Sequence, residues 1–121
     1  DTYARSFVNM KAMVKELYDN GLIVLAGTDG GILQHELEMY SDAGIPNAEV
    51  LRTATWWPAK VSGKESLLGS IEEGKTANLI LVDGNPLQDM RDIRKVFLTV
   101  RSGELYWPKS IYGTFGWGYY Y

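Results

Sequence analysis

The amino-acid sequence predicts an α/β protein, and three observations carry this prediction. Apolar residues recur at helical spacing before residue 20, a continuous apolar run follows at residues 22–26, and short apolar runs separated by turns dominate after Gly63. We therefore expect helices around one buried strand up to residue 62 and mostly β structure afterwards. The chain has 121 residues, 45% hydrophobic and 22% charged, which is typical of one soluble domain with a real core.

Four helices are expected in the first half, because apolar residues recur there every three or four positions. The first covers residues 3–20, with Gly21 following its last turn, where a left-handed residue commonly ends a helix. The second begins near Leu33 and stops at Gly44, and the third covers 46–54. A short fourth helix is expected at 58–63, because Pro58 suits a first helical turn.

The strands are predicted from shorter apolar runs. The run LIVLA at residues 22–26 is continuous and rich in branched side chains, which favours a parallel strand buried on both faces. Further strands are expected in ANLILVD at 77–83, in KVFLTV at 95–100, and after the tight turn in RSGELYW. The tail, WPKSIYGTFGWGYYY, is aromatic and rich in glycine, so we expect it to pack against something.

Composition argues against several functional classes. The net charge is −3 and no run of Lys or Arg occurs, so neither nucleic acid nor a membrane surface is an expected partner. The chain has no cysteine, which rules out disulfides and cysteine-bound zinc. No apolar run is long enough to span a bilayer, and the compartment is left open. The first residue is Asp1 rather than Met, and a helical pattern of the kind found in the middle of a protein follows at once, so we expect a processed or truncated piece.

Residues 69–76, GSIEEGKT, match the phosphate-loop pattern, but their surroundings argue against nucleotide binding. A phosphate loop precedes a helix whose N-terminus faces the anion, whereas a strand is expected to follow here. Glu72 and Glu73 would also repel phosphate groups. We therefore expect a turn between two strands at this place.

Asp29 follows the expected strand directly, in the sequence TDGG, and a helix follows it. A hairpin at Asp-Gly would need a second strand, so the helical pattern excludes it. Two interpretations stay open: a catalytic carboxylate at the C-terminal end of a barrel strand, or an aspartate that caps the next helix, with Thr28 as another candidate cap. The glycines Gly30 and Gly31 permit a close approach to a ligand. His35, the only histidine, lies in the first turn of that helix, where a surface position is the main alternative to a ligand role.

Several separate segments, in this order along the chain, resemble the C-terminal part of metal-dependent amidohydrolases of the imidazolonepropionase-like and prolidase-like branch. They are AGTDGG, AEVLRTAT, SIEEGKTANLILVDGNP and SGELY. The resemblance implies that residues 1–62 form the last βα unit of a (β/α)8 TIM barrel. It implies that residues 63–121 form part of a small β-sandwich domain and an aromatic tail, so the fold is incomplete as a single chain.

The resemblance also implies an activity. It implies a metal-dependent hydrolase that cleaves an amide or other C–N bond, of dipeptide or cyclic-amide type, through a metal-activated water. Asp29 matches the position that serves as metal ligand and catalytic proton carrier. Gly30, Gly31 and His35 are expected to bind substrate at the mouth of the pocket. One or two divalent ions are expected, zinc first, with manganese or cobalt as alternatives.

The other ligands of this family are a His-x-His pair, a bridging lysine or carboxylate and two further histidines, and this sequence has one histidine. A catalytic zinc takes about three protein ligands. We therefore expect a site shared with a companion N-terminal polypeptide of the same enzyme, acting on a small-molecule substrate, and a chain that is inactive alone. A homo-oligomer is compatible with this expectation. The alternative is a noncatalytic or scaffold fragment that binds no metal by itself.

Overall fold

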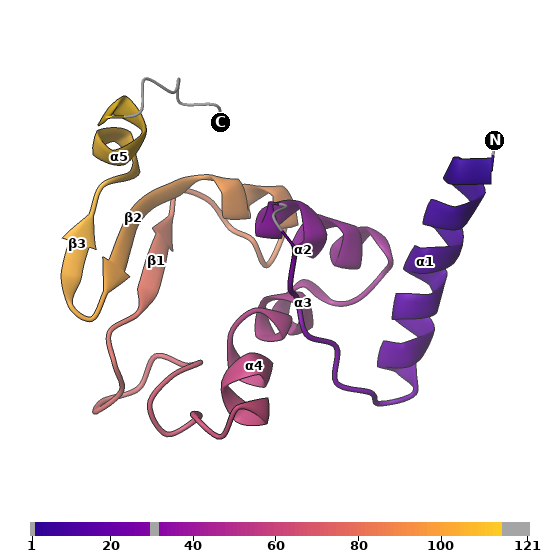
Figure 1. The fold of residues 1–121 in the computed structure, drawn as a ribbon, viewed down its shortest axis with the longest axis horizontal. Helices are drawn as coiled ribbons and strands as arrows, with labels where there is room; N and C mark the ends of the chain where they lie inside the picture. The colour runs from indigo at the N-terminus through magenta and orange to yellow at the C-terminus, as the bar shows by residue number, and fades with distance from the viewer. Residues whose placement is uncertain (1, 30–31, 115–121) are drawn as a thin grey trace.

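The computed structural model describes residues 2–29 and 32–114 and contains helices in its first part and a small sheet in its second (Figure 1). The helices are α1 Thr2–Asp19, α2 Leu33–Asp42, α3 Asn47–Thr53, α4 Trp56–Val61, the 3₁₀-helix η1 Met90–Arg94, and α5 Pro108–Thr114. The strands are β1 Leu79–Val82, β2 Val96–Arg101 and β3 Glu104–Tyr106. The predicted α/β class is confirmed. None of the described helices has the length and apolar character needed to cross a membrane.

The four expected helices are all present, with small shifts at their ends. Gly21 has a φ of 79°, as expected for the residue that follows the end of α1. Helix α4 begins at Trp56, two positions before the predicted start. Pro58 is therefore the third residue of α4. A backbone N–H at this position has no acceptor within the helix, so the N–H that proline lacks costs no helical hydrogen bond.

The buried strand predicted at residues 22–26 is not formed in the described structure, so that prediction is wrong for this chain. The segment is extended but joins no β-ladder. Leu22, Ile23 and Leu25 are 52%, 51% and 41% exposed. A buried parallel strand needs strands on both sides, and here the segment is held by contacts such as the bond from the Ala26 N–H to the Thr53 carbonyl at 3.0 Å.

The three later strands form one antiparallel sheet in the order β1-β2-β3. Leu79 lies opposite Val100 in the first pair, whose register shifts once between Leu81 and Val82. The turn between β2 and β3 is Ser102-Gly103, with φ values of 51° and 85°. Positive φ at both turn residues is the geometry that a two-residue hairpin prefers, and it explains why the predicted tight turn forms here.

The aromatic tail begins with a contact to this sheet. The Trp107 ring meets the Phe97 ring edge-on, with centroids 5.4 Å apart. The expected packing of the tail is therefore confirmed for Trp107. Helix α5, which follows, is not among the predicted elements, and residues 115–121 lie outside the described part of the chain.

The core joins the helices to the loop after β1. Its buried members are Leu37, Ile45, Val50, Met90 and Ile93. The last two belong to η1, an element that the sequence did not predict, and their spacing of three places both on one side of a 3₁₀ turn. The core thus combines residues from both sides of position 62. The predicted division into 1–62 and 63–121 stays a prediction.

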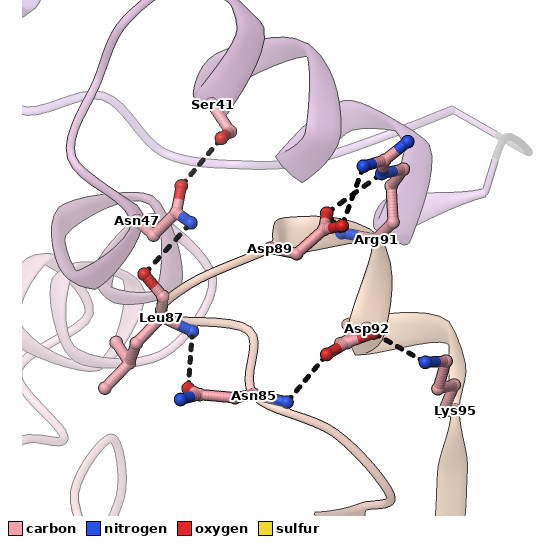
Figure 2. A network of polar contacts seen from close by, with 8 residues as sticks. All are labelled: Ser41, Asn47, Asn85, Leu87, Asp89, Arg91, Asp92 and Lys95. Atoms are coloured by element: carbon pink, nitrogen blue, oxygen red, sulfur yellow. Dashed lines mark hydrogen bonds and ion pairs between the residues drawn. The ribbon is translucent and has the colours of Figure 1, made fainter.

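Hydrogen bonds also connect α2 and α3 with the loop that follows β1 (Figure 2). Ser41 Oγ donates to Asn47 Oδ1 at 2.6 Å, and Asn47 Nδ2 donates to the Leu87 carbonyl at 3.2 Å. The Leu87 N–H donates to Asn85 Oδ1 at 3.2 Å, and the Asn85 N–H donates to Asp92 Oδ2 at 2.7 Å. Asn47 therefore uses both ends of its amide group to connect α2 with the loop that follows β1.

Gly84 is required by the close approach of Asp92. A Cβ at Gly84 would lie 2.6 Å from the Asp92 Cγ, which no side chain tolerates without a shift. The Asp92 carboxylate also binds Lys95 Nζ at 2.7 Å. The hydrogen bond from Lys95, followed by that from the Asn85 N–H, holds the pKa of the Asp92 carboxyl below its usual value. Gly84 thus leaves space for the Asp92 carboxylate, which holds the loop through its hydrogen bond from the Asn85 N–H.

Candidate functional site

Asp29 lies in a bend after the extended segment and before α2, and it is exposed. The N-cap position of α2 is Ile32, which makes no capping hydrogen bond through its side chain. Neither Asp29 nor Thr28 occupies the cap, so the capping interpretation is wrong. The catalytic and metal-binding roles of Asp29 stay predictions. Gly30 and Gly31 lie outside the described residues, and their predicted role in substrate binding stays a prediction as well.

The backbone just before Asp29 is held by the carboxylate of Glu36. The Gly27 N–H donates to the two Glu36 oxygens at 3.1 and 3.3 Å. The Tyr40 hydroxyl donates to Glu36 Oε1 at 2.5 Å. Burial, and then the hydrogen bond to Glu36, raise the pKa of the Tyr40 hydroxyl well above its ordinary value of 10.0, so this group stays a donor at any working pH.

Sequence reasoning missed this contact, because the favourable field at a helix N-terminus already accounts for acidic residues in the first turns of a helix. A signal was present in HELEMY, where Glu36 and Tyr40 are four residues apart. Side chains at this spacing lie on the same helix face and can interact directly. The spacing indicates that the two residues pair, but only the folded chain shows that Gly27 is the third partner.

His35 is the third residue of α2, as predicted, and its side chain is 60% exposed. Its Nδ1 lies 3.5 Å from Glu38 Oε2. The Glu38 carboxylate binds the guanidinium of Arg94 on η1 through two hydrogen bonds, and the one from Nη2 to Oε2 is 2.8 Å long. His35 therefore lies beside the Glu38–Arg94 ion pair, which links α2 to η1. Its predicted contact with substrate stays a prediction.

The hydrogen bond from Arg94 holds the pKa of the Glu38 carboxyl below its ordinary value of 4.5, although burial acts in the opposite direction. A carboxyl whose pKa is lower in the folded state stabilises the fold fully above its unfolded pKa. That stabilisation is lost as the pH falls through the folded pKa. The Glu38–Arg94 pair should therefore contribute at neutral pH and not in strong acid.

Arg94→Met is expected to lower the free energy of unfolding at pH 7 by about 0.5–1 kcal/mol, because the pair is partly exposed. The difference from wild type should shrink as the pH falls below 4.5, the ordinary value for Glu38. Urea unfolding at pH 7 and at more acid pH measures both values. Arg52→Met is the matched control, since Arg52 pairs with Glu49 three residues away and its side chain is 56% exposed. An equal loss at both pH values would contradict the proposed contribution of the pair.

The residues described here do not fit a complete metal centre. Within 2–29 and 32–114, no three His, Cys, Asp or Glu side chains form a group that could hold a metal ion. A catalytic zinc takes about three protein ligands. Asp29 could therefore supply one ligand, and the others would have to come from residues beyond the described ones.

The GSIEEGKT segment was predicted to be a turn between two strands, and only the strand after it is present in the described chain. Strand β1, and no helix, follows it, as expected, but residues 64–76 form turns without a preceding strand. Lys75 Nζ binds Ser70 Oγ at 2.5 Å and Glu72 Oε1 at 3.0 Å, and it lies 5.4 Å from the centroid of the Trp56 ring. The Lys75 side chain is 9% exposed. Its ammonium group is thus bound to neighbouring groups of the protein, whereas the lysine of a phosphate loop binds the phosphates of the ligand.

Comparison with known families gives one match over most of the chain. The model of the Amidohydrolase family matches residues 7–106. Among curated proteins, 5′-deoxyadenosine deaminase from Methanopyrus kandleri is 29% identical, over 76% of this chain and 29% of the relative. The 5-methylthioadenosine/S-adenosylhomocysteine deaminase from Moorella thermoacetica is 33% identical, over 60% of this chain and 20% of the relative.

Solved structures give similar matches at the level of the fold. A Xaa-Pro dipeptidase with methionine bound in its active site superposes with a TM-score of 0.76 and 32% identity, over 80% of this chain. A candidate prolidase from Bifidobacterium longum gives a TM-score of 0.71 and 33% identity, over 77% of this chain. The present chain covers 25% of each of these two solved chains.

Proposed function

Because this chain belongs to the amidohydrolase family, we propose that it is the C-terminal part of a metal-dependent hydrolase that cleaves an amide or other C–N bond. The observation that carries the proposal is the similarity to the Xaa-Pro dipeptidase, at 32% identity and a TM-score of 0.76. A dipeptide or a cyclic amide is the proposed class of substrate. The two deaminase relatives support the more general class, since deamination also breaks a C–N bond.

Asp29 is the proposed catalytic residue. Its carboxylate takes a proton from the water that attacks the scissile carbonyl and passes it to the leaving nitrogen as the C–N bond breaks. Its exposed position in the bend before α2 leaves the carboxylate accessible to water and substrate. Gly30, Gly31 and His35 are proposed to line the mouth of the site. When bound, a divalent ion, zinc first, would supply Lewis acidity and a more acidic water.

The remaining ligands are proposed to come from a companion N-terminal polypeptide of the same enzyme. The exposed apolar surface of this chain supports that proposal. Several side chains of α1 that the helical pattern would place on a buried face are open to solvent, as are those of the extended segment after it. The exposed residues are Phe7, Val8, Met10, Met13, Leu17, Leu22, Ile23 and Leu25. Exposed apolar side chains that are concentrated in adjacent segments commonly mark a contact with another part of a protein.

The complete protein, with its N-terminal part, is expected to hydrolyse members of a panel of Xaa-Pro dipeptides and cyclic amides, and this chain alone is expected to hydrolyse none. Removal of metal with a chelator should abolish turnover, and added zinc should restore it. Product release by chromatography and metal analysis of the same sample measure both effects. Turnover that survives complete metal removal would contradict the metal dependence. A complete protein that binds metal yet cleaves no C–N substrate would favour a noncatalytic role instead.

A further inference from the structure

Glu36 connects two separate parts of the chain beside the residue proposed to be catalytic, the segment before the bend and α2. Its carboxylate accepts hydrogen bonds from the Gly27 N–H and from the Tyr40 hydroxyl, at 3.1 and 2.5 Å. Gly27 lies in the extended segment two residues before Asp29, and Glu36 and Tyr40 both lie on α2. The contact therefore fixes the end of the extended segment relative to the helix that follows the bend.

The neighbouring backbone bond shows where this end of the segment is attached. The Ala26 N–H donates to the Thr53 carbonyl at 3.0 Å, and Thr53 is 3% exposed, with its hydroxyl bonded to the Val50 carbonyl at 2.6 Å. Consecutive amides of the segment are thus bonded to α3 and α2. These two bonds hold the backbone just before Asp29 through contacts made within this chain.

We propose that Glu36 is a positioning residue for Asp29, acting through the Gly27 N–H and held in place by the Tyr40 hydroxyl. The inference rests on the proposed function, because Asp29 acts on substrate only there. A charged acceptor suits this task, since hydrogen bonds to a carboxylate are roughly twice as strong as neutral ones. A reacting group displaced by about 1 Å can lose about 10²-fold in rate, so the position of this backbone matters for turnover.

Glu36→Ala in the complete enzyme is expected to lower kcat by about 10–100-fold, with KM nearly unchanged, because the displaced group acts in the chemical step. Glu36→Gln should restore most of the rate. Its amide oxygen can still accept the Gly27 N–H, while its NH₂ group can donate to the Tyr40 oxygen. The kcat of Tyr40→Phe should lie between those of Glu36→Ala and Glu36→Gln. Glu49→Ala is the matched control, since Glu49 is another helical glutamate and its ion pair is with Arg52.

Amide hydrogen exchange, followed by mass spectrometry of peptides covering residues 22–29, provides a readout that does not depend on turnover. Exchange should be faster in Glu36→Ala and Tyr40→Phe than in wild type and Glu49→Ala, and close to wild type in Glu36→Gln. Wild-type kcat and wild-type exchange in Glu36→Ala would overturn the proposal. If Glu36→Ala does not fold, unchanged exchange and kcat in Tyr40→Phe together with loss of activity in Glu36→Gln would overturn it.

Asp29→Asn, assayed in parallel, separates this inference from the proposed function. If Asp29→Asn is inactive and Glu36→Ala is fully active, only the positioning role fails. If Asp29→Asn keeps its turnover, the proposed function fails, whatever the result for Glu36. Faster exchange in Glu36→Ala with an unchanged rate would show that Glu36 holds the backbone without positioning a catalytic group, and this outcome also overturns the proposal.

Discussion

Asp29→Asn in the complete protein is expected to lower kcat by about 10³-fold or more while the fold is retained, because general base catalysis contributes about 10²–10⁴-fold and this residue is also the proposed metal ligand. Asparagine has nearly the same shape as aspartate and keeps one acceptor oxygen. It cannot take a proton from water, and it carries no charge. Because Asp29 is exposed in a bend and does not cap α2, its replacement should leave the surrounding structure intact.

Steady-state kinetics on the best dipeptide or cyclic-amide substrate measures this effect, and a thermal unfolding curve shows whether the variant is folded. Asp42→Asn is the matched control, because Asp42 is a surface aspartate at the end of α2 with a side chain 70% exposed and 3.9 Å from Lys11 Nζ. We expect that control to keep wild-type turnover. A rate for Asp29→Asn within a few-fold of wild type would rule out Asp29 as the catalytic base.

Gly69→Ala is expected to destabilise the protein by about 2–4 kcal/mol, through two separate effects. Gly69 has a φ of 91°, which an alanine adopts only with strain. In addition, its new Cβ would lie 2.7 Å from the Ala59 Cβ and 3.0 Å from the Thr55 carbonyl oxygen. Ala59 is buried in α4, and the Thr55 carbonyl is at the start of that helix, so neither atom can move easily.

Gly74→Ala separates the two effects. Gly74 lies in the same segment and has a similar φ of 88°, but a Cβ there meets nothing within 4 Å. This control should therefore show only the strain of the left-handed conformation, about 1–2 kcal/mol. The difference between the two variants in urea unfolding measures the packing of the GSIEEGKT segment on α4. Equal losses in the two variants would contradict that packing.

Local patterns predicted the elements whose hydrogen bonds are themselves local. The four helices of the first half close their bonds within four residues, so the spacing of apolar residues and the glycines at their ends were sufficient to place them. The hairpin of β2 and β3 is equally local, since Ser102-Gly103 supplies the positive φ values that its turn needs. The quoted segments also predicted the family, whose model matches residues 7–106.

Long-range contacts explain why the strand prediction at residues 22–26 is wrong and why η1 was not predicted. The pattern at residues 22–26 indicates a strand that is suited to burial between neighbours, but whether it joins a sheet depends on strands elsewhere in the protein, and none of the strands in the described chain pairs with it. Helix η1 was missed for a related reason. Its two buried residues, Met90 and Ile93, are held by packing on α2 and α3 rather than by a repeating pattern of their own.

The sequence by itself determined the α/β class, the helices of the first half, the hairpin and the position of Asp29 after an apolar run. Only the tertiary structure decided that Asp29 does not cap α2 and that Glu36 binds the backbone two residues before it. It alone paired Glu38 with Arg94, 56 residues away. The physical reason is range: periodicity and turn chemistry act over a few neighbouring residues. The partner of a carboxylate is determined by which elements the folded chain brings together.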